Sequence, residues 1–96
     1  MYKLNELKKV TPDEELMRME IEIEGYVQGV GFRPFVYRLA KSLGLKGWIS
    51  NSTKGILINA EGSKKKLEDF LVYLEKQKPP LALIRSMDYS FLKPVD

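Results

Sequence analysis

The chain of 96 residues contains no cysteine and no histidine. Without cysteine it has no disulfide bond, no thiolate nucleophile and no zinc or iron–sulfur site built on thiolates. Without histidine it has no Ser-His triad and no histidine-based metal site. Any catalysis must therefore rely on carboxylates, lysine, arginine, amides, hydroxyls or the backbone, and we expect neither a metal nor another cofactor.

Long apolar runs and a large charge excess are also missing. No stretch approaches the roughly 20 apolar residues of a membrane span, and the N-terminal sequence MYKLNELKKV lacks the apolar core of a signal peptide. These absences predict a soluble, cytoplasmic protein without a membrane partner. With 16 Lys and Arg against 13 Asp and Glu, the net charge is +3. This balance suits an anionic ligand but is too weak to indicate nucleic acid.

The length and composition are those of one small globular domain. Chains this short rarely form two cores, and a content of 44% hydrophobic and 10% aromatic residues is typical of a folded protein. We expect an N-terminal appendage over residues 1–18, in which Thr11-Pro12-Asp13-Glu14 has the form of a helix start. The folded domain is expected over residues 19–93.

Hydrophobic periodicity predicts four strands and two helices in this domain. Met19, Ile21 and Ile23 alternate with glutamates, as in a strand with one wet face. Further strands are expected at 48–49, 56–60 and 81–92, with helices from Pro34 to Gly44 and from a Ser63 cap to Pro79. The order β-α-β-β-α-β predicts an α+β, ferredoxin-like sandwich, with two helices on one face of an antiparallel sheet.

This topology brings two distant segments together. The first and second strands run parallel with the third between them, so their carboxyl ends lie at the same edge of the sheet. We therefore expect the glycine-rich loop after the first strand to lie beside the turn at Asn51, although Arg33 and Asn51 are 18 positions apart.

The loop Gln28-Gly29-Val30-Gly31-Phe32-Arg33 has the features of an anion site. Glycines allow successive N–H groups to face one concavity, a helix N-terminus follows, and Arg33 adds a planar cationic fork. It is neither a dinucleotide fingerprint nor a Walker loop. The alternative is a loop that only connects the first strand to the first helix, with Arg33 in a surface ion pair and Asn51 as an ordinary turn residue.

The motifs Gly25-Tyr26-Val27-Gln28-Gly29-Val30-Gly31-Phe32-Arg33 and Leu43-Gly44-Leu45-Lys46-Gly47-Trp48-Ile49-Ser50-Asn51 resemble the acylphosphatase family. Pro34, Tyr37-Arg38-Leu39-Ala40 and Pro79-Pro80-Leu81-Ala82 are most similar to the acylphosphatase-like N-terminal domain of hydrogenase-maturation carbamoyltransferases.

The resemblance implies hydrolysis of an acyl phosphate, with carbamoyl phosphate as one candidate, to carboxylate and phosphate. It implies that Arg33 and the amides of Gln28, Gly29, Val30, Gly31 and Phe32 bind the phosphate, and that Asn51 holds the attacking water. Ser52-Thr53-Lys54 departs from many stand-alone acylphosphatases, which carry an acidic residue there.

Two other functions compete with catalysis. The chain can be a non-catalytic anion-binding domain, excised from or belonging to a larger carbamoyltransferase whose other domains are its partners. RNA binding is disfavoured because RNA-binding sheets of this fold carry aromatic residues on the first and third strands, where this chain has none. Trp48, on the second strand, is expected to pack in the core or at its rim.

Overall fold

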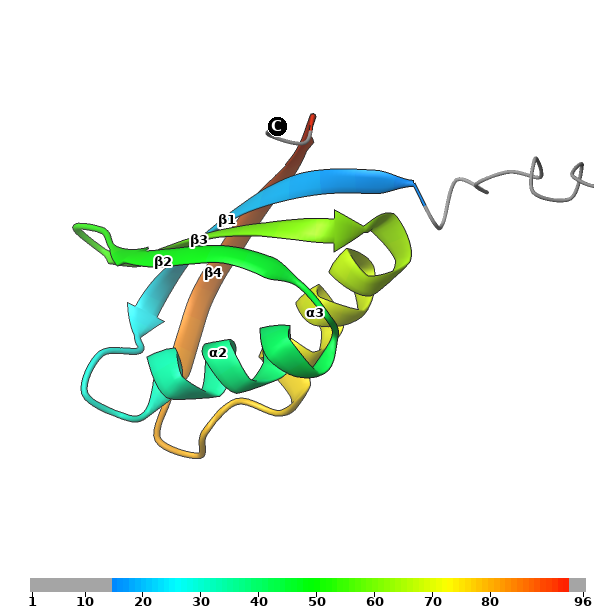
Figure 1. Ribbon diagram of the computed structural model, residues 1–96. Helices are drawn as coiled ribbons and strands as arrows, with labels where there is room; N and C mark the ends of the chain where they lie inside the picture. Colours follow the sequence, from blue (N-terminus) through cyan, green and yellow to red (C-terminus); the bar gives the residue numbers. More distant parts are fainter. Residues whose placement is uncertain (1–14, 94–96) are drawn as a thin grey trace, which may run out of the picture.

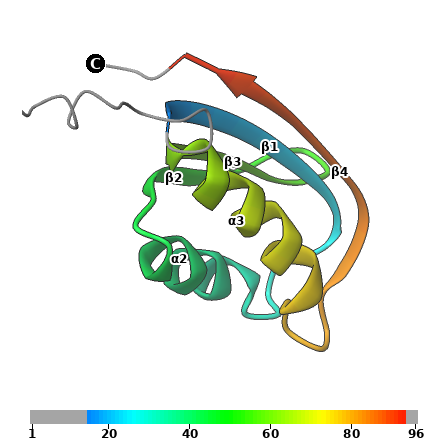
Figure 2. The ribbon, with the colours of Figure 1, turned by 90° about the vertical axis from the view of Figure 1, so that its right-hand side faces the viewer.

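The computed structural model describes residues 15–93, which form a four-stranded sheet with two helices on one face (Figures 1 and 2). In chain order the elements are β1 Leu16–Tyr26, α2 Phe32–Ser42, β2 Lys46–Asn51, β3 Gly55–Ser63, α3 Lys64–Lys76 and β4 Leu83–Leu92. The order confirms the predicted ferredoxin-like α+β class. β1 includes residues 16–18, which we assigned to the appendage, and the helix start at residues 11–14 lies outside the described residues.

The sheet has the strand order β2-β3-β1-β4. β3 pairs antiparallel with both β1 and β2, so β1 and β2 run parallel with β3 between them. The carboxyl ends of β1 and β2 consequently lie at the same edge of the sheet, as the topology predicted. In Figure 1 the loop after β1 and the end of β2 both lie at the left of the molecule, on the side where α2 starts.

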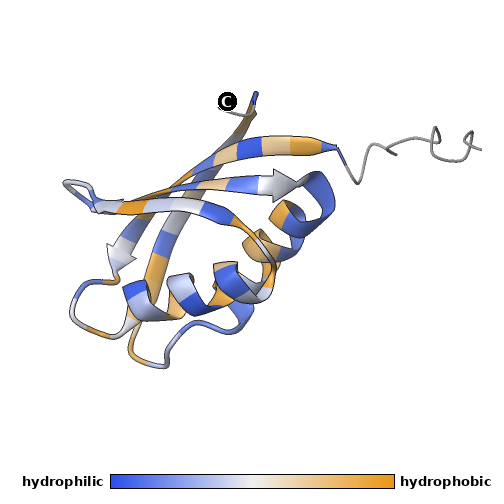
Figure 3. Cartoon of the chain, in the orientation of Figure 1, coloured by the Kyte–Doolittle hydropathy of each residue, from blue (hydrophilic) through white to orange (hydrophobic). Residues whose placement is uncertain are grey.

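The core lies between the sheet and the helices. The predicted alternation in β1 is confirmed, because Met19, Ile21 and Ile23 are fully buried. Figure 3 shows the same alternation of apolar and polar residues along the strands. Fully burying a side chain of this size contributes about 1.5–3 kcal/mol. The helices complete the core with Phe35, Val36 and Leu39 from α2 and Leu67, Phe70 and Leu74 from α3.

Several element boundaries differ from the predictions. α2 begins at Phe32, two residues before Pro34, which therefore occupies the third helical position. Proline fits there because the N–H groups of the first turn have no intrahelical partner. β2 is longer than predicted because its whole length pairs with β3, and β4 begins at Leu83 rather than Leu81. The predicted cap of α3 is confirmed, since the Ser63 side chain accepts a hydrogen bond from Lys66 N at 3.2 Å.

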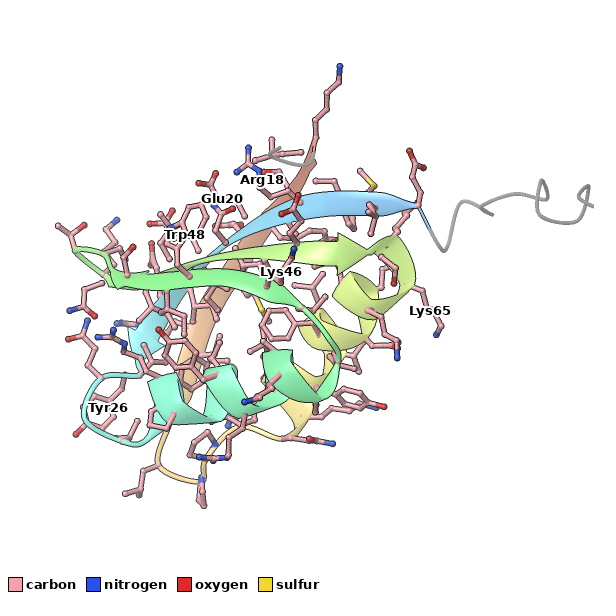
Figure 4. All side chains as sticks on the ribbon, in the orientation of Figure 1. Arg18, Glu20, Tyr26, Lys46, Trp48 and Lys65 are labelled. Carbon is pink, nitrogen blue, oxygen red and sulfur yellow. The ribbon has the colours of Figure 1, made fainter. Side chains whose placement is uncertain are left out.

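The prediction that Trp48 packs in the core or at its rim is wrong. Trp48 lies opposite Asn59 in the sheet and is 55% exposed. Figure 4 shows it on the face of the sheet opposite the helices, the same face that carries Arg18 and Glu20. Within residues 15–93 both helices cover the other face, so no layer buries this side chain.

None of the helices in this range combines the length and apolar character needed to cross a bilayer.

Candidate functional site

The loop between β1 and α2 takes a conformation that glycine makes possible. Gly29 and Gly31 have φ angles of 76° and 80°, in the left-handed region that favours glycine. A Cβ atom at either position would meet nothing within 4 Å, so the need for glycine arises from the backbone angle and not from crowding. Turns of this kind can direct successive backbone N–H groups into an anion-binding concavity.

Helix α2 adds further N–H donors directly after this loop. Gly31 is its N-cap, and the first intrahelical hydrogen bond is donated by Phe35 N to Gly31 O at 3.2 Å. The N–H groups of Phe32 and Arg33 precede that bond, so they are available to a ligand. The first turn contains no acidic side chain to compete for the positive end of the helix dipole. The start of α2 therefore favours an anion.

The predicted site residues meet in one pocket of about 300 Å³. Its lining consists of Gln28, Gly29, Gly31, Phe32, Arg33 and Asn51, together with Val27 and Pro34. Of the loop residues predicted to bind phosphate, Val30 is not part of this lining. The Phe32 side chain is buried in the core, so Phe32 can offer a ligand only its backbone. The expected proximity of the loop and Asn51 is confirmed.

Arg33 and Asn51 both line this pocket, and their side-chain polar groups have no partner elsewhere in the described part of the chain. Neither the Arg33 guanidinium nor the Asn51 side-chain amide makes a hydrogen bond or ion pair within residues 15–93. The alternative in which Arg33 is held in a surface ion pair therefore finds no support there. An arginine fork and a carboxamide facing one pocket can bind a phosphate and orient a neutral oxygen nucleophile.

Two hydrogen bonds hold the loop against the turn between β2 and β3. Gln28 Nε2 donates to Gly55 O at 3.0 Å, and Gly25 N donates to Lys54 O at 3.2 Å. Sequence reasoning placed Gln28 among the phosphate ligands and missed this contact of its side chain. The contact depends on the register of the β2–β3 hairpin, which no local sequence signal reveals.

The residues after Asn51 lie beside the pocket and not in its lining. Lys54 Nζ is 3.7 Å from Glu24 Oε2, and Lys54 lines a separate hollow with Tyr26 and Gln28. The Ser52 hydroxyl is buried and has no hydrogen-bond partner within residues 15–93. In this same range no group of three or more acidic side chains is arranged to hold a metal ion.

Comparison of the sequence with known proteins points to one family. The acylphosphatase family model matches residues 19–95. The chain is 46% identical to an acylphosphatase of Thermotoga maritima over 70 residues, which cover 72% of this chain and 77% of that protein. It is also 50% identical to carbamoyltransferase HypF2 of Cupriavidus necator over 68 residues, covering 71% of this chain and 8% of the relative.

A solved structure gives the same result in three dimensions. Full-length HypF in its phosphate- and nucleotide-bound form superposes with a TM-score of 0.80 at 35% identity, over 83% of this chain and 11% of that one. The chain thus spans about a tenth of the carbamoyltransferases that it matches, and more than three quarters of the Thermotoga acylphosphatase. On this sequence and structural evidence, the chain belongs to the acylphosphatase family.

Proposed function

We propose that the chain hydrolyses acyl phosphates to a carboxylate and inorganic phosphate in the pocket between the β1–α2 loop and Asn51. The observation that carries the proposal is the convergence of Arg33, the N–H groups at the start of α2 and the Asn51 amide on one open pocket. The acylphosphatase relative, most of whose length the chain covers, supports the same activity.

Each group has a role that its chemistry allows. The Arg33 fork and the N–H groups of the loop bind the phosphoryl oxygens and stabilise their charge in the transition state. Asn51 holds a water molecule, whose oxygen forms a bond to phosphorus while the bond from phosphorus to the acyl oxygen breaks. The carboxylate leaves, one proton of the water passes to a phosphoryl oxygen, and the other stays on the oxygen that is now bonded to phosphorus. Phosphoryl transfer depends mainly on positioning and charge stabilisation, so histidine is not needed.

A second function is favoured by the carbamoyltransferase relatives. The chain spans 8% of the Cupriavidus protein, and the solved HypF structure is described as phosphate-bound. In this alternative the chain is an anion-binding domain of a larger carbamoyltransferase, with the other domains as its partners. Carbamoyl phosphate is then the candidate ligand, and the same pocket binds its phosphate without turnover.

A cytoplasmic location of the chain stays a prediction.

Release of inorganic phosphate from acetyl phosphate distinguishes the two functions. We expect the purified chain to accelerate this release in the presence of a chelator, because no cluster of ligands for a metal ion occurs within residues 15–93. Arg33→Ala should abolish the acceleration. The control Arg38→Ala, on an exposed arginine of α2 outside the pocket, should retain it. A folded wild-type chain that binds phosphate without turnover would establish the anion-binding alternative.

A further inference from the structure

A second pocket, of about 500 Å³, lies between α2 and the edge strand β2. Its volume is in the range of pockets that enclose small organic ligands. Most of its lining residues are apolar, among them Val36, Ala40, Leu45, Ile49 and Phe70, and Tyr37, Lys41 and Lys46 also contribute. We call this pocket the α2–β2 groove. The apolar part of this lining suits an apolar group of a ligand.

The helix wall of the groove continues from the anion pocket. Arg33, Tyr37 and Lys41 follow one another at intervals of four residues, so they lie along one face of α2. Arg33 lines the anion pocket, whereas Tyr37 and Lys41 line the groove. Each step along this face advances about 6 Å along the helix axis.

The strand wall continues in the same way. Asn51, Ile49 and Gly47 alternate along β2 and pair with the buried residues of β3, so they share the face that looks toward the helices. Asn51 lines the anion pocket, whereas Ile49 and Gly47 line the groove. Each step of two residues advances about 6.6 Å along a strand.

Successive residues along the helix wall and along the strand wall are therefore spaced by similar distances. Because β1 and β2 are parallel and α2 connects them, α2 runs antiparallel to β2, as Figure 1 shows. Arg33 and Asn51 mark one end of the walls, and Tyr37 and Ile49 follow about 6 Å further on. The anion pocket and the groove share no lining residue, but they follow one another along the same helix and the same strand.

We propose that the α2–β2 groove is the acyl subsite and that it selects acyl phosphates with an aryl or medium-chain acyl group. The inference rests on the proposed function, since it takes the phosphate to be bound at Arg33. An acetyl or carbamoyl group has a single heavy atom beyond its carbonyl and ends before Tyr37. A phenyl ring or a chain of several carbons extends along the groove and buries apolar surface against Tyr37 and Ile49.

Tyr37 is the specificity-determining residue in this arrangement. It is 55% exposed, so its truncation leaves the core intact, and it lines the groove one turn along α2 from Arg33. The chain provides a matched control in Tyr89, which is 54% exposed on β4, at the opposite edge of the sheet from β2. The two tyrosines share residue type and exposure but differ in their distance from the groove.

Binding of two phosphonates tests the subsite without requiring turnover. Acetonylphosphonate and phenacylphosphonate carry a CH₂ group in place of the bridging oxygen, and they differ only in methyl against phenyl. By calorimetry we expect the wild-type chain to bind phenacylphosphonate about tenfold more tightly, the ratio expected from partial burial of one ring. Tyr37→Ala should reduce this ratio to about two, and Tyr89→Ala should leave it unchanged.

The outcomes separate the subsite from the proposed function. Equal affinities of the wild-type chain for the two phosphonates, or a ratio that Tyr37→Ala does not lower, would overturn the subsite even if acetyl phosphate is hydrolysed. A preference for phenacylphosphonate that depends on Tyr37, in a chain that hydrolyses no acyl phosphate, would support the subsite and refute the proposed hydrolysis.

Discussion

The side-chain amide of Gln28 donates a hydrogen bond to the carbonyl oxygen of Gly55, 3.0 Å away, and so connects the β1–α2 loop to the turn that follows Asn51. The loop itself and Asn51, which precedes this turn, line the anion pocket. A second hydrogen bond, from Gly25 N to Lys54 O, runs between the same segments. The relative position of Arg33 and Asn51 thus depends on contacts that neither of them makes.

The first prediction concerns this connection. Gln28→Ala removes one hydrogen bond and leaves the Gly25–Lys54 bond in place, so we expect the free energy of unfolding to fall by about 0.5–1.5 kcal/mol. Phosphate affinity should fall by less than about tenfold, because the backbone donors remain. Urea unfolding and phosphate titration measure the two effects. Gln77→Ala, on an exposed glutamine at the end of α3, is the control. A complete loss of phosphate binding would show that the Gln28 side chain is itself a ligand.

The second prediction separates Arg33 from Asn51. Arg33→Ala removes a bidentate, charge-assisted contact from both the bound and the transition state, so phosphate affinity and turnover should each fall about 100-fold. Asn51→Ala should lower kcat about 100-fold while changing phosphate affinity less than about twofold, because its proposed partner is water. Isothermal titration with inorganic phosphate and steady-state kinetics provide the comparison. Equal losses of phosphate affinity in the two variants would refute the role of Asn51.

The third prediction tests the loop backbone. Gly31→Val places a β-branched residue at a φ of 80°, which should cost about 1–3 kcal/mol of stability and abolish phosphate binding by turning the N–H groups away.

Gly44 is the matched control for this variant. It has a φ of 71° and follows α2 at the end remote from Arg33, and a Cβ atom there would likewise meet nothing within 4 Å. Gly44→Val should therefore cost a similar amount of stability and leave phosphate binding intact. Amide shifts in NMR during phosphate titration report both variants. Wild-type affinity in Gly31→Val would show that the loop amides are not the phosphate ligands.

The fourth prediction concerns Ser52, whose buried hydroxyl has no hydrogen-bond partner within residues 15–93. Ser52→Ala removes a polar group that has lost its hydration, so the free energy of unfolding should stay unchanged or rise by up to about 1 kcal/mol. Ser50→Ala, at an exposed position of β2, should have no effect. Thermal or urea unfolding is the measurement. A loss of more than about 1 kcal/mol in Ser52→Ala would reveal a partner for this hydroxyl.

Periodic and topological features could be predicted from the sequence. The alternation from Met19 to Ile23 identified a strand and its buried face, and the order of elements brought Arg33 close to Asn51. Both follow from rules that hold along the chain or for the whole fold. The start of α2 at Phe32 was missed because Gly31 caps the helix through its backbone conformation and not through a side chain.

Features that depend on register or on neighbouring layers could not be predicted. The contact between Gln28 and Gly55 requires the exact pairing of the β2–β3 hairpin. The exposure of Trp48 depends on which sheet face the helices cover, and an aromatic residue in a short apolar segment gives no sign of it. The α2–β2 groove lies where α2 faces the edge strand β2, and this becomes visible only when helix and strand are placed side by side.

Hydrolysis of acetyl phosphate in water enriched in ¹⁸O tests the central claim most directly. If the pocket binds the phosphoryl group and Asn51 directs water at phosphorus, one labelled oxygen should appear in the inorganic phosphate for each turnover and none in the acetate. Label in the acetate would mean that water attacks the carbonyl carbon, and release of phosphate no faster than in buffer would mean that the pocket does not catalyse the reaction. Either result would contradict the proposed mechanism.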